Sequence, residues 1–337
     1  MKAIQIHEPG DITVLKYEEV EVPDPGVGQV RVRLHAAGIN HRDIWVRQGS
    51  LGAGIQAIIP GSDGAGEIDA IGAGVRDWSV GQKVVINPGL SCGTCAACLR
   101  GDHPACPAFR IFDGTYAEYA VVPAQNLVAM PGGLTFAEAA SIGIPYVTAE
   151  DYLIRAEALP GQTLLLWGAT GGLGLATLQL ARLRGLRVIA ATRSQQRVDK
   201  LRQMGADDVL LLTPGEDVAD AVMSLTQGRG ADLVVDSVGQ ASFPQSLGSV
   251  ARGGVIVTVG ATTGGSVALD LGRLFRHRVN LMGAFMGSAS ILPRLLPLFA
   301  RGVLVPVIDN IFPLEQADQA HEQMENHGVF GKLILTM

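Results

Sequence analysis

The sequence has few charged residues, and more of them are acidic than basic. Charged residues make up 17% of the 337 residues and hydrophobic residues 47%, which excludes a disordered chain or an acidic-tail protein. The net charge of -6 argues against nucleic acid or an anionic membrane as the main partner. The 43 glycines lack the three-residue period of collagen, so we expect them in turns and close backbone approaches. The length predicts about two domains.

Neither a secretory signal nor a membrane span is expected. The start, MKAIQIHEPG, lacks the apolar core of a signal peptide, so we expect a cytoplasmic protein. Residues 158–181 carry no charge and are long enough to cross a bilayer. Pro160, Gly161 and a cluster of further glycines interrupt them, however, and a strand–turn–helix needs such breakers more than a spanning helix does.

The two parts of the chain differ in pattern. The first 125 residues predict a mostly antiparallel β segment, with short strands at 30–34, 66–71 and 83–86 between Gly/Pro turns. Thr135 and Glu138 have the spacing of a capping box at a helix start. From residue 163 onward, apolar strands alternate with helices, which indicates a parallel sheet covered on both faces. The last residues, KLILTM, again look like a strand.

All four cysteines lie close together, in the pattern C-x2-C-x2-C-x7-C. Clustered thiolates in a cytosolic chain favour tetrahedral zinc over the two alternatives, a pair of disulfides or a redox pair. Four protein ligands leave no open coordination position, so this zinc should be structural. The ligands would be Cys92, Cys95, Cys98 and Cys106.

A glycine-rich turn lies between an apolar strand ending at Trp167 and a helix beginning near Leu175. Such a turn presents free backbone N–H groups and the positive end of a helix to a pyrophosphate. The pattern A-x-G-G-x-G departs by one residue from the usual dinucleotide fingerprint. The residues expected to bind a cofactor here are Ala169, Thr170, Gly171, Gly172, Leu173 and Gly174.

The end of the next strand, near Thr192, indicates which cofactor binds. NAD-binding proteins place a carboxylate there for the ribose hydroxyls, but this chain has none before Asp199. A cation among small hydroxyls suits a 2′-phosphate, so we favour NADPH; alternatively, the arginines are solvated surface residues. The predicted 2′-phosphate residues are Thr192, Arg193, Ser194 and Arg197.

The cysteine lobe within a β-rich part, followed by a dinucleotide fold, resembles the medium-chain dehydrogenase/reductase superfamily over nearly the whole chain. The resemblance implies an α/β protein with a GroES-like β-rich catalytic domain and a Rossmann domain, a doubly wound parallel sheet. We expect the catalytic domain at 1–130 and 286–337, with the zinc lobe at 91–107, and the Rossmann domain at 131–285. The resemblance further implies that five more residues contact the cofactor: His41, Thr148, Gly260, Ala261 and Lys332.

The positions at which the sequence departs from the zinc alcohol dehydrogenases of that superfamily say more about its function than the positions that match. Asn40 and Ser62 stand where two catalytic zinc ligands would be, and the third position falls near Ile144. Arg42 replaces the hydroxyl of the alcohol proton relay. A catalytic zinc is therefore not expected, and these replacements resemble the quinone oxidoreductase branch, although that branch usually lacks the cysteine lobe.

The resemblance implies hydride transfer from NADPH to a quinone or an α,β-unsaturated carbonyl, because such acceptors delocalise charge without a Lewis acid. Candidate hydrogen-bond donors are Asn40 and Tyr146, with added positive charge from Arg42 and with Asp43 as its neighbour. An alcohol dehydrogenase that uses side chains alone, and an NADPH-binding sensor or scaffold without turnover, remain alternatives.

The apolar segment 279–287 fits an edge strand through which cofactor domains of this superfamily pair. A buried internal strand would have the same pattern. We expect a homodimer or a dimer of dimers that acts on a small-molecule carbonyl or quinone.

Overall fold

The computed structural model describes residues 1–50, 57–213, 215, 217–326 and 328–337. The chain forms two compact units, Met1–Val147 with Ser288–Met337 and Thr148–Gly287. Residues 131–147, which we expected in the Rossmann domain, lie in the first unit because helix α3 (Phe136–Ala140) packs on that unit's strands. Helix α4 (Gly143–Arg155) crosses the division.

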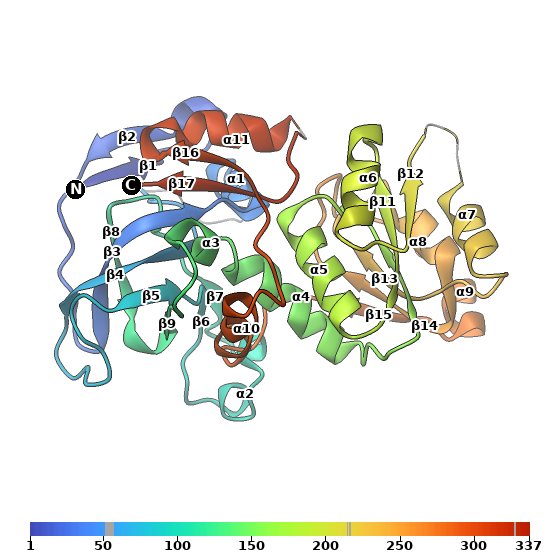
Figure 1. The fold of residues 1–337 in the computed structure, drawn as a ribbon, viewed down its shortest axis with the longest axis horizontal. Coiled ribbons are helices and arrows are strands. Elements are labelled where there is room, and N and C mark those ends of the chain that lie inside the picture. The colour runs from blue at the N-terminus through green and yellow to red at the C-terminus, as the bar shows by residue number, and fades with distance from the viewer. Residues whose placement is uncertain (51–56, 214, 216, 327) are drawn as a thin grey trace. The chain divides into compact units, whose positions relative to one another are not determined.

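The first unit is built on a seven-stranded sheet of order β16-β17-β3-β4-β5-β9, with β8 paired to β3 (Figure 1). All its pairs are antiparallel except β16 with β17. The strands predicted at 30–34, 66–71 and 83–86 lie within β3, β4 and β5. The strand bounds are β3 Gln29–Gly38, β4 Asp63–Ile71, β5 Lys83–Ile86, β8 Tyr119–Pro123, β9 Leu127–Ala129, β16 Ile308–Pro313 and β17 Lys332–Thr336.

Strand β3 shows why this sheet forms. Its alternate residues Val30, Val32 and Leu34 are buried and pack in one core with Ile68 and Val84. Two small ladders complete the unit: β1 (Lys2–Gln5) with β2 (Lys16–Glu19), and β6 (Gly89–Leu90) with β7 (Arg110–Ile111).

Short helices link these strands. The capping box predicted for α3 is present: Thr135 Oγ1 accepts from the Glu138 N–H at 3.2 Å, and the Glu138 carboxylate accepts from the Thr135 N–H at 2.7 Å. Helix α1 begins directly after β3, which fixes Asn40 and Arg42 at the end of a central strand. The remaining helices are α1 His41–Arg47, α2 Ala96–Leu99, α10 Ile291–Ala300 and α11 Ala317–Glu325, with one-turn 3-10 helices at 12–14, 103–105, 124–126 and 314–316.

The second unit is a parallel sheet of order β12-β11-β10-β13-β14-β15, which confirms the predicted doubly wound sheet. Figure 1 shows α5 on one side of this sheet and α7, α8 and α9 on the other. The strands are β10 Thr163–Leu166, β11 Arg187–Thr192, β12 Asp208–Leu211, β13 Ala231–Asp236, β14 Val250–Thr258 and β15 Asn280–Gly283. The helices are α5 Gly172–Leu183, α6 Gln195–Gln203, α7 Val218–Leu225, α8 Phe243–Ser249 and α9 Leu271–His277.

Residues 158–181 form the end of a loop, strand β10, the glycine turn and most of α5. Across the described part of the chain, no helix combines the length and apolarity that a membrane crossing requires.

Candidate functional site

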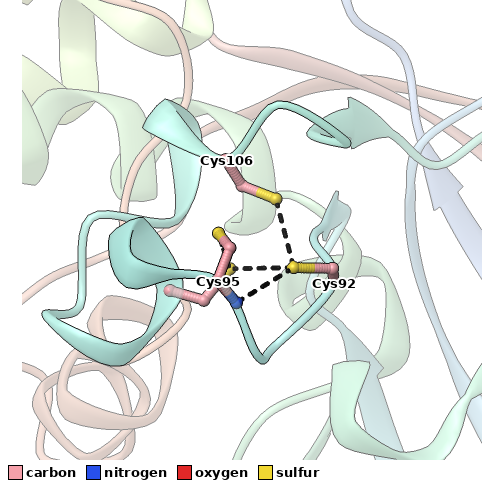
Figure 2. Close-up of side chains that lie close together, drawn as sticks. Cys92, Cys95 and Cys106 are labelled. Atoms are coloured by element: carbon pink, nitrogen blue, oxygen red, sulfur yellow. Dashed lines mark hydrogen bonds between the residues drawn. The ribbon is translucent and has the colours of Figure 1, made fainter.

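The four cysteine sulfurs meet in one cluster, all within 4.8 Å of one another. Sγ of Cys92 lies 3.9 Å from that of Cys98 and 3.6 Å from that of Cys106, and Cys95 lies 3.6 Å from Cys98. Figure 2 shows the Cys92 and Cys106 sulfurs turned toward each other. A zinc ion with Zn–S bonds of about 2.3 Å requires tetrahedral S–S edges of about 3.8 Å, whereas a disulfide requires about 2.05 Å.

The lobe therefore fits one structural zinc and excludes the disulfide alternative. The Cys95 N–H donates to Cys92 Sγ at 3.3 Å, and the Thr94 hydroxyl donates to the same sulfur. Backbone donation from Thr94 and Cys95 lowers the pKa of Cys92 to about 6, so this thiol is readily converted into the thiolate that zinc binds.

The glycine turn joins β10 to α5 with a left-handed residue, Gly168, at φ +64°. Gly171 is the N-cap of α5, and as a glycine it has no side chain with which to cap the first N–H groups. The N–H groups of the first turn are thus available to an anion, and the positive helix end favours one. Ala169 is buried, whereas Thr170, Gly171, Gly172 and Leu173 are half-buried.

Gly174 allows the helix to approach the strand closely. A Cβ at this position would lie 2.3 Å from the Gly168 carbonyl oxygen and 2.7 Å from the Ala169 backbone. We expect Gly174→Ala to lower the free energy of unfolding by about 1–3 kcal/mol and to weaken NADPH binding, because the turn must shift. Urea unfolding and NADPH titration measure the two effects.

Gly171→Ala is the matched control for folding. Its φ of -77° suits alanine, and the nearest atom to the new Cβ would lie at 3.9 Å. Its free energy of unfolding should stay within about 0.5 kcal/mol of the wild-type value or rise slightly. Equal unfolding midpoints for the two variants would contradict the role given to Gly174.

The end of β11 lies close to this turn. Arg197 Nη1 donates to Thr170 Oγ1 at 3.3 Å, so the two predicted cofactor segments are in contact. The Ser194 N–H donates to Thr192 Oγ1 at 3.2 Å, while Arg193 is exposed.

Other residues predicted to contact the cofactor lie apart from the turn in sequence. Thr148 is buried, with Oγ1 3.7 Å from Met286 Sδ. Gly260 passes so close to Ser237 that a Cβ would lie 2.7 Å from its carbonyl oxygen, and Ala261 beside it is half-buried. His41 is half-buried and packs edge-on against Trp45. The cofactor contacts of these residues stay predictions.

In the first unit, the segments that replace the catalytic zinc ligands meet at Asp63. Its Oδ2 accepts from Asn40 Nδ2 at 3.0 Å and from Lys332 Nζ at 3.2 Å, and its Oδ1 accepts from the Ile144 N–H at 2.7 Å. The Asp63 and Lys332 side chains are 1% and 5% exposed. No functional role was expected for Asp63 from the sequence.

The buried ammonium of Lys332 donates hydrogen bonds to three acceptors. Besides Asp63, it donates to the Ile39 carbonyl and to Asn40 Oδ1, both at 2.7 Å. All three of its protons are therefore used within this unit. Its predicted contact with a pyrophosphate stays a prediction and would require these bonds to break.

The residues at this position do not fit a catalytic zinc. Ile144 offers no side-chain ligand, and Asn40 Oδ1 already accepts from Lys332. A dication would also lie beside a buried ammonium, which is unfavourable at short range in a low-dielectric interior.

Two predicted hydrogen-bond donors are occupied. Both N–H groups of the Asn40 amide have acceptors, Asp63 at 3.0 Å and the Gly38 carbonyl at 3.4 Å. The Tyr146 hydroxyl donates to the Val305 carbonyl at 3.2 Å, and its ring packs edge-on against Phe299.

Arg42 is paired with Asp113, not with the expected neighbour Asp43. Its Nη1 and Nη2 donate to the two Asp113 oxygens at 2.5 and 2.8 Å, and Nη1 also donates to Ser62 Oγ at 3.2 Å. Burial opposes the charge of Arg42, but the bonds to Asp113 outweigh it, and the pKa of Arg42 is raised.

Asp43 belongs to a second buried network, which meets the Asp63 cluster at Asn40. Its Oδ2 accepts from the Asn40 N–H and from the Tyr116 hydroxyl, both at 2.9 Å, and the Tyr116 oxygen lies 3.3 Å from His321 Nε2. Burial raises the pKa of Asp43 to about 6. Burial, together with the charge of Arg47, lowers the pKa of His321 to about 3.

Comparison with known proteins agrees with this fold. The alcohol dehydrogenase GroES-like domain matches residues 26–132, and the zinc-binding dehydrogenase family matches residues 172–301. A zinc-type alcohol dehydrogenase-like protein of Schizosaccharomyces pombe is 31% identical, over 95% of this chain and 94% of its own.

Two solved structures cover the whole chain. An NAD-dependent alcohol dehydrogenase is 38% identical with a TM-score of 0.95, and all of its chain is covered. Escherichia coli quinone oxidoreductase complexed with NADPH is 25% identical with a TM-score of 0.87, and all of its chain is also covered. The match of family, sequence and structure along the whole length shows that this oxidoreductase belongs to the medium-chain dehydrogenase/reductase superfamily.

Proposed function

We propose that the protein transfers hydride from NADPH to a quinone or an α,β-unsaturated carbonyl compound without a catalytic zinc. The observation that carries the proposal is the Asn40–Asp63–Lys332 cluster, in which a buried ion pair contacts Asn40, a residue predicted to replace a catalytic zinc ligand. Without a Lewis acid, an acceptor that delocalises its own developing charge is the easiest to reduce. The solved quinone oxidoreductase that is complexed with NADPH supports both the cofactor and the acceptor class.

The glycine turn and the end of β11 would hold the cofactor. The N–H groups at the start of α5 face the pyrophosphate, while Arg193 and Arg197 supply cations for a 2′-phosphate, with hydroxyls from Thr192 and Ser194. Thr148, Gly260 and Ala261 would flank the nicotinamide. When bound, NADPH supplies the hydride.

The acceptor's developing negative charge needs hydrogen-bond donors in the first unit. Asp63 and Lys332 keep the ends of β3, β4 and β17 in place, so the site is rigid before the acceptor binds. Arg42 contributes a fixed positive charge in a largely buried position.

We further propose that two copies pair through β15. It is an edge strand of the six-stranded sheet, and Leu281 and Phe285 near it are 43% and 60% exposed. Leu271 and Phe275 on α9, the helix that precedes β15, are exposed as well. A homodimer, or a dimer of two such dimers, would cover these side chains.

An alcohol dehydrogenase is the second candidate. The solved NAD-dependent alcohol dehydrogenase at 38% identity favours it. It would have to polarise an alcohol with side chains alone, which lack the several kcal/mol that a zinc ion contributes.

The two candidates differ in substrates, cofactor and metal content. We expect oxidation of NADPH, faster than of NADH, with enones and quinones, together with about one zinc per chain. Spectrophotometry at saturating cofactor and metal analysis of the same sample measure these quantities. Alcohol oxidation with NAD, two zincs per chain and no reaction with enones or quinones would overturn the proposal; NADPH binding without any turnover would favour a sensor or scaffold.

A further inference from the structure

We propose that Arg42, held in place by Asp113, is the residue that binds the acceptor oxygen during hydride transfer, and that Asp113 is a positioning residue for it. The inference rests on the proposed function and adds to it the group that replaces the Lewis acid. Its support is the count of hydrogen-bond donors around the residues predicted to replace the catalytic zinc ligands.

The guanidinium of Arg42 has five N–H groups. Asp113 takes one from Nη1 and one from Nη2, and Ser62 Oγ takes the second from Nη1. One Nη2–H and the Nε–H remain, and among the described residues neither has an acceptor within hydrogen-bond distance. These two donors lie on the same edge of the planar group and point in nearly the same direction, so a single oxyanion can accept from both.

The other candidates have no donor to offer. Both amide protons of Asn40, all three of Lys332 and the hydroxyl proton of Tyr146 are engaged with acceptors of the same unit. Ser62 is fully buried, whereas the Arg42 side chain is 17% exposed. Of these residues, Arg42 is therefore the one that combines free N–H donors with a side chain that an acceptor can reach.

Asp113 explains why Arg42 can act in one fixed orientation. Two parallel bonds of 2.5 and 2.8 Å hold the guanidinium end-on, which leaves its remaining edge turned away from the carboxylate. The donors are therefore oriented before the acceptor arrives, which is the condition under which they stabilise developing charge most strongly.

The chemistry balances without a metal. The hydride brings two electrons to the β-carbon of an enone, the C=C pair shifts to give an enolate, and the negative charge on its oxygen is held by the Nε–H and Nη2–H. The hydride leaves a C4–H bond of the nicotinamide, so NADPH becomes NADP⁺. A water molecule then gives a proton to the α-carbon and is left as hydroxide, which the buffer protonates. Arg42 keeps its own protons throughout, because a guanidinium does not ionise in proteins.

The test compares Arg42→Ala, Arg42→Lys and Asp113→Asn in the full-length protein, with a simple enone such as cyclohexenone as acceptor. We expect kcat/KM to fall by about 10²–10³-fold in Arg42→Ala, as on removal of an oxyanion donor, while the Kd for NADPH stays the same. Arg42→Lys keeps the charge but loses the two-donor edge, so a loss of about 10-fold or more is expected. Asp113→Asn should lower kcat more than it raises KM.

Added guanidinium ion should restore part of the activity of Arg42→Ala, which a purely structural role would not allow. Arg33→Ala is the matched control: Arg33 pairs with Glu67 at 2.8 Å on the same sheet, away from this position, and its loss should leave kcat/KM unchanged. If Arg42→Ala does not fold, Arg42→Lys and Asp113→Asn decide the question.

A failure of the proposed function and a failure of the role given to Arg42 produce different results. If the wild type oxidises NADPH with neither enones nor quinones, the proposed function is wrong. If the wild type is active but Arg42→Ala or Arg42→Lys keeps more than half of its kcat/KM, or guanidinium restores nothing to Arg42→Ala, the role of Arg42 alone is overturned.

Discussion

Replacing Cys106 with serine is expected to reduce the zinc content from about one per chain to nearly none. The three remaining thiolates cannot complete the tetrahedron that the S–S distances of 3.6–3.9 Å describe. Structural zinc in small peptides contributes about 10–16 kcal/mol of apparent binding free energy, which is folding free energy for the segment it closes. The lobe at 91–107 should therefore unfold locally.

The rest of the first unit should remain folded. Strands β6 and β7 flank the lobe, and no residue of 91–107 is among the residues of the cores around β3 and β17. Metal analysis and amide hydrogen exchange, resolved by residue, measure the two effects. Exchange should accelerate in 91–107 and stay slow in β3 and β4.

Thr94→Ala is the control for the cysteine variant. It removes a hydroxyl that donates to Cys92 Sγ at 3.7 Å but leaves all four thiolates, so zinc should remain at about one per chain. A full equivalent of zinc retained by Cys106→Ser would show that the metal binds elsewhere. Two equivalents in the wild type would contradict our interpretation of Asn40, Ser62 and Ile144.

The features that the sequence predicted well are local. The four cysteines lie within fifteen residues, and the glycine turn lies between a strand and a helix that adjoin it in the chain, so spacing alone indicates their geometry. The capping box at Thr135 is local in the same sense.

The features that it missed depend on distant contacts. Asp63 meets Lys332 across 269 positions, Tyr116 meets His321 across 205, and Arg42 meets Asp113 across 71. No periodicity or motif in a single sequence marks such pairs, because each residue is locally an ordinary charged or polar one. The boundary near residue 131 was missed for the same reason: α3 looks like the first helix of a new domain until its packing on β3 and β4 is known.

We expect Asp43→Asn and His321→Gln to change the pH dependence of stability in opposite directions. For His321, with a folded-state pKa of about 3, the unfolded chain binds a proton below about pH 6.5 and the folded chain does not. Stability from this residue is therefore lost as the pH falls from 6.5 toward 3, by about 1.4 kcal/mol per pH unit.

Asp43 acts in the other direction. Its pKa is raised from 3.8 to about 6, so between pH 4 and 6 the folded chain holds a proton that the unfolded chain has released. Its contribution is complete below about pH 4 and is lost as the pH rises to 6, again by about 1.4 kcal/mol per unit. In the wild type the two effects largely cancel between pH 4 and 6.

Each variant removes one of the two titrating groups, so the pH dependence contributed by the other group should become measurable. Relative to the wild type, Asp43→Asn should lose about 3 kcal/mol of unfolding free energy as the pH falls from 6 to 4, and His321→Gln should gain about the same. Urea unfolding at half-unit pH steps measures the differences, from which all other titrating groups cancel. Val27→Ala is the control, because Val27 is 83% exposed. Its free energy of unfolding should differ from the wild-type value by the same amount at every pH. Parallel curves for all four proteins would show that neither buried group titrates as the Tyr116 network requires.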